Sequence, residues 1–465
     1  MTRLYECGAV ELGQRIRARD VSSREVVEAH LARIAAIDAD LGAVTVVLGE
    51  AALAAADAAD RGEPRSPLHG VPFSVKENID CLGSPTTHGL PSLREALPYA
   101  DAPAVARLKA AGAIPIARTN LSELGMRLCT VNPLHGRTRN PFDPRLSVGG
   151  SSGGDAAAVG TGMVPLGLGG DIGGSLRVPA ECCGVAALKP TSGRIPIASS
   201  LPPLDSGMAA QAMLVLGPIA RHSADLRAAL ALLAGRDGRD PRSVDVPLRG
   251  PPPEVRAVGL VTSLPGLPLP APTVAAIERA GAALAARGWQ VELASPPELD
   301  RVHDVFAKLL ATDLSIIAPQ VQPAISEALF EHLMRLCRVA RVPEASNYRL
   351  HCERSRLARE WSRFFTDYPV VIGPNWAHAI WPVDADLDPD RGVELLRQTV
   401  RFITPGNALG PPSVVLPMGV AGGLPTSIQI YADLWREDLC LDAAELIEAE
   451  RGPIVPVDPV RRSLA

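Results

Sequence analysis

The stretch GGSSGGDAAAVGTGMVPLGLGGDIGGSLRVPA (residues 149–180) decides how this chain folds. It lies within a longer tract, residues 136–193, that is rich in Gly, Ser and Pro. A polar tract of this composition would form a flexible linker, but apolar runs at 164–168 and 185–188 interrupt it. We therefore predict a backbone that bends tightly inside a core.

The segments on either side alternate between strand and helix patterns. PLHGVPFSVKENID (67–80) predicts an apolar strand that runs into Lys76, and APAVARLKAAG (102–112) predicts a helix that leads into the strand AIPIA. The alternation resumes from residue 252, and 300–365 has a mainly helical pattern. Strand, helix and strand in succession indicate a layered α/β sheet.

Composition excludes several classes of function. The 465 residues are 47% hydrophobic and 21% charged, in the ordinary range of globular proteins. A net charge of -5, without a run of Lys or Arg, makes nucleic acid an unexpected ligand. No stretch reaches the roughly 18 apolar residues of a membrane helix, and the start MTRLYECGAVELGQ has no apolar leader. We expect a cytoplasmic protein that does not bind membranes.

Motifs for metals, nucleotides and disulfides are also missing. No zinc, calcium or phosphate-loop spacing occurs, so we expect neither a metal nor another cofactor. The cysteines have no C-x-x-C spacing, which favours buried thiols over bridges; they are Cys7, Cys81, Cys129, Cys182, Cys183, Cys337, Cys352 and Cys440.

One lysine and a glycine turn that ends in serine have the properties that attack on an amide requires. Such a reaction needs a base for the hydroxyl proton and donors for the oxyanion. Lys76 follows an apolar strand, where loss of solvation disfavours its charged form and makes it a competent base. Ile172, Gly173 and Gly174 precede Ser175, and the glycines let successive N–H groups turn toward one point. We predict an oxyanion hole there.

Four blocks in a fixed order resemble the amidase signature family: GVPFSVKENID, NPFDPRLSVGGSSGGDAAAVG, LGLGGDIGGSLRVPA and CGVAALKPTSGR. The resemblance covers nearly the whole chain. It implies that Lys76 takes a proton from Ser151, which takes one from the nucleophile Ser175, with a cis peptide bond at Ser151. A carboxamide would then be hydrolysed through an acyl-Ser175 ester, which water cleaves.

The resemblance also implies the architecture. We expect a single domain over residues 1–465, with a large mixed β-sheet covered by helices on both faces. Its core would span 60–250 and 365–447, and a variable, mainly helical section at about 265–365 would shape a site for a small-molecule amide. A homodimer is the oligomeric state that the family suggests.

Other residues are candidates for supporting roles. Asp171 and Arg177 flank the nucleophile and form either a brace for its loop or a plain ion pair, and Ser152 follows Ser151. Gly125 and Met126 match a stretch that lines the acyl pocket in relatives.

The sequence also contains an aromatic group of open function and several departures from the family pattern. Trp376, His378 and Trp381 are either an aromatic wall of the pocket or ordinary packing. The departures are Asp155, Gly170, Glu181, Cys182 and Ser192. Gly170 lacks a threonine hydroxyl that would support the two serines.

Rival functions remain open. An α/β-hydrolase would use Ser152 as the nucleophile of a G-x-S-x-G elbow, which requires a strand directly before it. Acyl transfer to an amine would use the same acyl-enzyme, as would an amidase-like component of a glutamine-dependent amidotransferase. The segment LLRQTVRFITPGN lacks the acidic residue that we expect in a glutamine site. A non-enzymatic binding protein would be expected to have lost a triad residue.

Overall fold

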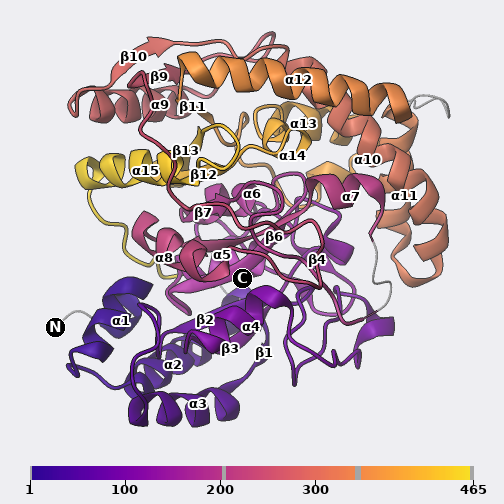
Figure 1. Ribbon diagram of the computed structural model, residues 1–465. Helices are drawn as coiled ribbons and strands as arrows, with labels where there is room; N and C mark the ends of the chain where they lie inside the picture. Colours follow the sequence, from indigo (N-terminus) through magenta and orange to yellow (C-terminus); the bar gives the residue numbers. More distant parts are fainter. Residues whose placement is uncertain (1–2, 202–205, 341–346, 461–465) are drawn as a thin grey trace.

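The computed structural model describes residues 3–201, 206–340 and 347–460, and these form one large mixed sheet with helices around it (Figure 1). The strand order from edge to edge is β1-β3-β2-β6-β8-β7-β12-β13-β11-β9-β10, and β4 pairs with β5 separately. The strands are β1 (Val44–Val47), β2 (Pro72–Lys76), β3 (Ile114–Thr119), β4 (Val131–Asn132), β5 (Gly136–Arg137), β6 (Leu166–Asp171), β7 (Ala186–Lys189), β8 (Val215–Ala220), β9 (Ala257–Leu260), β10 (Gln290–Leu293), β11 (Val370–Pro374), β12 (Ser413–Ala421) and β13 (Leu424–Tyr431).

The pairing of β2 with β6 places the site. These two strands are parallel neighbours, with Ser74 opposite Gly167 and Val75 opposite Leu168. β2 ends at Lys76 and β6 ends at Asp171. Because the carboxyl ends of parallel strands meet at the same edge of a sheet, these two residues lie at one edge.

Helices cover both faces, as the resemblance implied. Along β12, Val414 and Leu416 join one apolar cluster and Val415 joins another, because successive side chains of a strand point to opposite faces. The first cluster packs under α1 (Ala9–Arg17), α4 (Pro103–Ala110), α8 (Ser223–Leu233), α9 (Ala271–Ala285) and α15 (Glu437–Arg451). On the opposite face lie α2 (Ser23–Leu41), α3 (Gly49–Arg61), α5 (Gly153–Gly160) and α6 (Arg177–Cys183).

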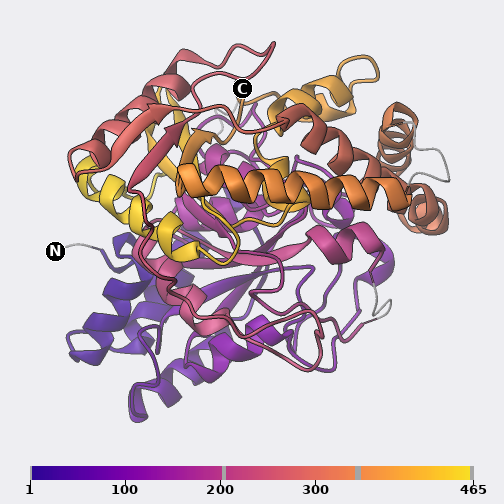
Figure 2. The same ribbon diagram turned by 45° about the horizontal axis from the view of Figure 1, so that its top comes forward.

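A group of helices near the C-terminal half of the sheet completes the fold. A third cluster joins Val371 of β11 and Tyr431 of β13 to these helices. They are α7 (Met208–Met213), α10 (Leu299–Val321), α12 (Asn347–Asp367) and α14 (Thr404–Ala408), with α11 (Glu327–Ala340) and α13 (Gly392–Thr399) beside them. Figure 2 shows α12 as a long helix that crosses the molecule in front of the sheet.

Most of the sequence-based expectations for the fold are confirmed. The strand that runs into Lys76, the helix after residue 102 and the helical stretch 300–365 all form. Residues 149–180 hold α5, β6 and the start of α6, and nearly all of them are buried, so the predicted tight bending inside a core is confirmed. The division into a core and a variable section stays a prediction.

The centre of the sheet depends on a glycine. Gly217 lies on β8 between β6 and β7, and a Cβ atom added there would lie 2.1 Å from the carbonyl oxygen of Leu188. Backbone on a neighbouring strand cannot move aside for it. A methyl group at this position must therefore distort the sheet.

We predict that Gly217→Ala lowers the free energy of unfolding by about 1–3 kcal/mol, as overpacking of a core does. Gly238→Ala is the matched control, because a Cβ atom at Gly238 meets nothing within 4 Å. Urea unfolding followed by circular dichroism measures both. Equal midpoints for the two variants would contradict the prediction.

Candidate active site

Lys76 lies buried at the end of β2 and contacts Ser151. Its Nζ donates a hydrogen bond to Ser151 Oγ at 2.6 Å, and the two residues are only 1% and 2% exposed. Burial lowers the pKa of Lys76 to about 8, although the charges of Asp155 and Asp171 act in the opposite direction. Part of the lysine population is therefore neutral near pH 7, as a base must be.

Asp155 is the departure from the family pattern that affects Lys76. Side chains two apart on a strand share a face, so Ser74 and Lys76 point the same way from β2. Ser74 Oγ donates to Asp155 Oδ1 at 2.7 Å, which holds this carboxyl on the same face as the lysine. Burial raises the pKa of Asp155 to about 6. Above that pH its charge stabilises the ammonium form of Lys76.

The turn that carries Ser151 enters α5. The peptide bond between Gly150 and Ser151 is cis, as the resemblance implied. The N–H of Ser152 donates to the carbonyl oxygen of Ser175 at 3.2 Å, so the two serine turns are joined directly. Ser152 Oγ donates to the carbonyl oxygen of Gly170 at 3.3 Å. The main chain of Gly170 thus supports this turn although the residue has no hydroxyl.

The Ser175 turn is held by an ion pair between Asp171 and Arg177, both fully buried. The carboxylate of Asp171 accepts hydrogen bonds from the N–H groups of Gly174, at 2.8 Å, and Leu176, at 3.1 Å. Burial alone would raise the pKa of Asp171, but the charge and hydrogen bonds of Arg177 outweigh it and hold that pKa well below its usual range. The pair is therefore a brace for the loop as well as an ion pair.

Of the main-chain N–H groups predicted to bind an oxyanion, one already has a hydrogen-bond acceptor, and the others have none in the part of the chain that the structure describes. The N–H of Gly174 is engaged by Asp171. Within the described chain, no acceptor takes the N–H groups of Ile172, Gly173 or Ser175. These three main-chain donors are free to receive an oxygen of a bound molecule.

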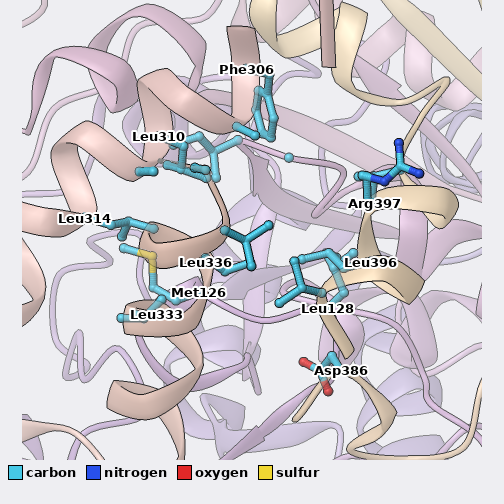
Figure 3. A pocket seen from close by; sticks show the side chains of 18 of the residues that line it. Met126, Leu128, Phe306, Leu310, Leu314, Leu333, Leu336, Asp386, Leu396 and Arg397 are labelled. Carbon is cyan, nitrogen blue, oxygen red and sulfur yellow. The ribbon is translucent and has the colours of Figure 1, made fainter. Parts of the chain in front are cut away.

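A cavity of about 370 Å³ opens over Ser175. The predicted residues Gly125, Met126, Ile172 and Gly173 line it together with Ser175, whereas Lys76, Ser151 and Gly174 do not line it. Most of the remaining wall is apolar and comes from α10, α11 and α13: Phe306, Ala307, Leu310, Ala311, Leu314, Leu333, Leu336, Val393 and Leu396, with Leu128 and Val400 beside them. Figure 3 shows Phe306 and Leu310 across the cavity from Leu128 and Leu396.

The charged groups of the wall are paired with one another or with neighbours. Arg127 binds Asp386, with Nη2 2.8 Å from Oδ1. Asp300 accepts from Arg401. The two others, Asp304 and Arg397, pair with Lys308 and with Glu394. The cavity therefore offers apolar surface rather than free charge.

Two contacts join the catalytic side of the cavity to its helical wall. Glu123, in the turn that carries Gly125, accepts hydrogen bonds from the N–H and the Oγ of Ser326 at the start of α11, each at 2.6 Å. A Cβ atom on Gly125 would lie 3.4 Å from Ser151 Oγ, so this turn reaches the serine itself. The sequence pattern did not reveal the contacts of Glu123, because they join segments about 200 residues apart. It did not reveal the cavity residues of α10 and α11 either, because these helices are also far in sequence from the serine turns.

The structure argues against two alternatives that the sequence left open. Trp376 and Trp381 stack edge to face at 4.8 Å in the core, and His378 is exposed; none of the three lines this cavity, so they are no aromatic wall for it. The α/β-hydrolase elbow also fails, because residues 138–152 contain no strand and Ser152 is fully buried.

The remaining observations concern cysteines, metals and membranes. All eight cysteines are free; six are buried, but Cys337 is partly buried and Cys352 is exposed. Residues 3–201, 206–340 and 347–460 contain no group of three or more His, Cys, Asp or Glu side chains placed to hold a metal ion. In the same ranges, no helix is long and apolar enough to cross a membrane.

Comparison with known proteins agrees with this geometry. A family model described as Amidase matches residues 25–441. Indoleacetamide hydrolase of Bradyrhizobium diazoefficiens is 37% identical over 97% of this chain and 87% of its own length. One component of the glutamyl-tRNA(Gln) amidotransferase of Thermus thermophilus is 33% identical over 92% of this chain and 94% of its own.

Solved structures agree as well. The structure of 6-aminohexanoate cyclic dimer hydrolase complexed with substrate superposes with a TM-score of 0.83 at 27% identity, and the match covers 97% of this chain and 98% of that one. A lysine and two serine turns at one edge of an eleven-stranded sheet, and a family match over most of the sequence, lead to the same conclusion: the chain belongs to the amidase signature family and is an enzyme that acts on amide C–N bonds.

Proposed function

We propose that this enzyme hydrolyses carboxamides with an apolar acyl group, through an acyl ester on Ser175. The observation that carries the proposal is the buried hydrogen bond from Lys76 Nζ to Ser151 Oγ, 2.6 Å long, beside a serine that faces an apolar cavity. Water is scarce around such a lysine, and its neutral form is accessible near pH 8.

In the proposed mechanism, neutral Lys76 accepts the proton of Ser151, and Ser151 accepts that of Ser175 as Ser175 Oγ attacks the amide carbon. The N–H groups of Ile172 and Gly173 bind the oxyanion, since neither has another acceptor among the described residues. The relay then returns the proton to the leaving nitrogen, and the C–N bond breaks. Water attacks the ester with the same relay as base, which frees the acid and regenerates Ser175.

The cavity supports an arylalkyl amide as the substrate. Its wall is mostly aliphatic and aromatic, and its volume of about 370 Å³ suits a bicyclic ring. The relative from Bradyrhizobium diazoefficiens is named for indoleacetamide, which has such a ring. We therefore propose indole-3-acetamide and similar primary amides as the substrate class.

The amidotransferase and acyltransferase alternatives use the same acyl-enzyme. A glutamine site needs fixed charges for an α-amino and an α-carboxylate group, but the charged residues of this wall are paired with neighbours. This pairing favours apolar amides over glutamine. Transfer to an amine differs from hydrolysis only in the nucleophile that attacks the ester.

We further propose that the enzyme works in the cytoplasm and as a homodimer, with no nucleic-acid partner. Its eight free cysteines support the cytoplasmic location. The net charge of -5 supports the lack of a nucleic-acid partner. The dimer follows from family resemblance alone.

Lys76 gives the proposal a test in pH dependence. Because only the neutral amine accepts a proton, we expect kcat/KM to rise with pH and to level off above an apparent pKa near 8. We expect Lys76→Ala to lose about 100- to 10,000-fold in rate. Lys76→Arg should fail too, because a guanidinium stays protonated. Lys109→Arg, which keeps a charge beside Asp101, is the control.

Asp155→Ser adds a second arm to this experiment. Removal of the carboxylate takes away a charge that raises the pKa of Lys76, so the rise of the profile should move to lower pH. A folded Lys76→Arg enzyme with near-normal turnover would show that Lys76 is a structural charge. An unmoved profile in Asp155→Ser would show that this carboxyl does not affect the pKa of Lys76.

We predict that a serine-directed phosphonate labels Ser175, since this residue lines the cavity beside the free N–H groups. Mass spectrometry of the digested adduct identifies the modified residue. Ser175→Ala should lose both labelling and turnover. Ser152 should stay unlabelled in the wild-type enzyme, because its side chain is fully buried. An adduct on Ser152 would be incompatible with the proposed mechanism.

A panel of amides tests the substrate class. We expect indole-3-acetamide, phenylacetamide and hexanamide to be hydrolysed with kcat/KM at least about 100-fold above that of glutamine, because the wall offers apolar burial and no free charge. Ammonia and acid release are measured with and without added hydroxylamine, which intercepts the acyl ester. A preference for glutamine would favour the amidotransferase alternative.

A further inference from the structure

One imidazole in the cavity wall lacks a hydrogen-bond partner. His332 on α11 lines the cavity and is 2% exposed. Its Nδ1 is buried and has no partner among the described residues. Buried polar atoms are rarely left unpaired, because their lost contact with water is not replaced. Because Nδ1 is closed off from solvent, a molecule that fills the cavity can supply its partner only after the imidazole ring turns toward it.

The protonation state of His332 follows from its surroundings. Burial lowers its pKa, the carboxylate and the main-chain carbonyl of Asp386 act against this, and the cations Arg127 and Arg335 reinforce it. The ring is therefore neutral near pH 7 and carries one proton. The main-chain carbonyl oxygen of Asp386 can only accept, and Nδ1 has no partner among the described residues, so we assign the proton to Nε2. Nδ1 is left with a lone pair, as an acceptor.

The neighbours of His332 make this acceptor selective. Leu333 and Leu336 on the same helix are apolar and line the same cavity. The carboxylate of Asp386 is bound by Arg127, at 2.8 and 3.0 Å. An acyl group that fills the cavity thus meets hydrocarbon on most sides and a neutral nitrogen acceptor at one point.

We propose that His332 is a specificity-determining residue, whose Nδ1 accepts a hydrogen bond from an N–H group on the acyl part of the substrate. The favoured substrates are amides of arylalkyl acids whose ring carries such a donor, as an indole does. The inference rests on the proposed function, because it concerns the acyl group of the same amide. A hydrocarbon ring of equal size would enter the cavity but leave the imidazole unpaired.

The test compares kcat/KM for indole-3-acetamide with that for 1-methylindole-3-acetamide, in which a methyl group replaces the ring N–H. We expect the wild-type enzyme to prefer the first by about tenfold or more, the effect of one buried hydrogen bond. His332→Leu should abolish this preference and still hydrolyse the methylated amide. His332→Asn, whose side-chain oxygen can accept near the position of Nδ1, should restore part of it.

His303→Leu is the matched control. This second imidazole of the wall has its Nδ1 3.4 Å from Thr404 Oγ1, so its loss should leave the preference in place. Equal kcat/KM for the two amides in the wild-type enzyme overturns the inference and leaves the proposed function standing, and it does so even if His332→Leu fails to fold. Loss of the preference in His303→Leu alone also overturns it. An enzyme that hydrolyses no apolar amide overturns the proposed function and this inference together.

Discussion

The buried ion pair between Asp171 and Arg177 is the contact on which the site depends. Arg177 donates to Asp171 and also to the carbonyl oxygen of Ile403, to Asn407 and to Tyr431, so one guanidinium joins α6, α14 and β13. Asp171 in turn holds the main chain on both sides of Ser175. A buried pair of this kind costs about 3–5 kcal/mol to break from one side, because the other charge stays buried without compensation. The geometry of the nucleophile loop is therefore fixed by contacts outside it.

Lys76 and Arg177 are both buried, but their pKa values are shifted in opposite directions. Arg177 keeps its charge because Asp171 and four further acceptors surround it, and its pKa stays above its usual value despite burial. Lys76 has only the hydroxyl of Ser151 as its hydrogen-bond partner among the described residues, and burial lowers its pKa. The two buried basic residues thus differ in function because they differ in the number of acceptors, and because a guanidinium does not release a proton.

The sequence predicts the parts of this enzyme that are local. The strand into Lys76, the two serine turns and their glycines lie within short segments whose composition determines their shape, and the structure has them where expected. The cavity wall is different. Phe306, Leu333 and Leu396 are apolar positions on amphipathic helices, and such a pattern indicates which face is buried without indicating what that face meets. The role of Trp376 stayed open at the level of sequence for the same reason: an aromatic cluster packs in a core as readily as it lines a pocket.

The contact between Glu123 and Ser326 has a consequence for the evolution of substrate range. It fastens the start of α11 to the loop that reaches Ser151, so the wall of the cavity and the proposed proton relay share one anchor. An exchanged α11 from another enzyme would bring new side chains to the pocket but would also need a serine-like cap at its start. Single substitutions on the face of α11 that lines the cavity keep this contact, whereas replacement of the whole helix loses it. We therefore expect the substrate range to change more easily through such substitutions.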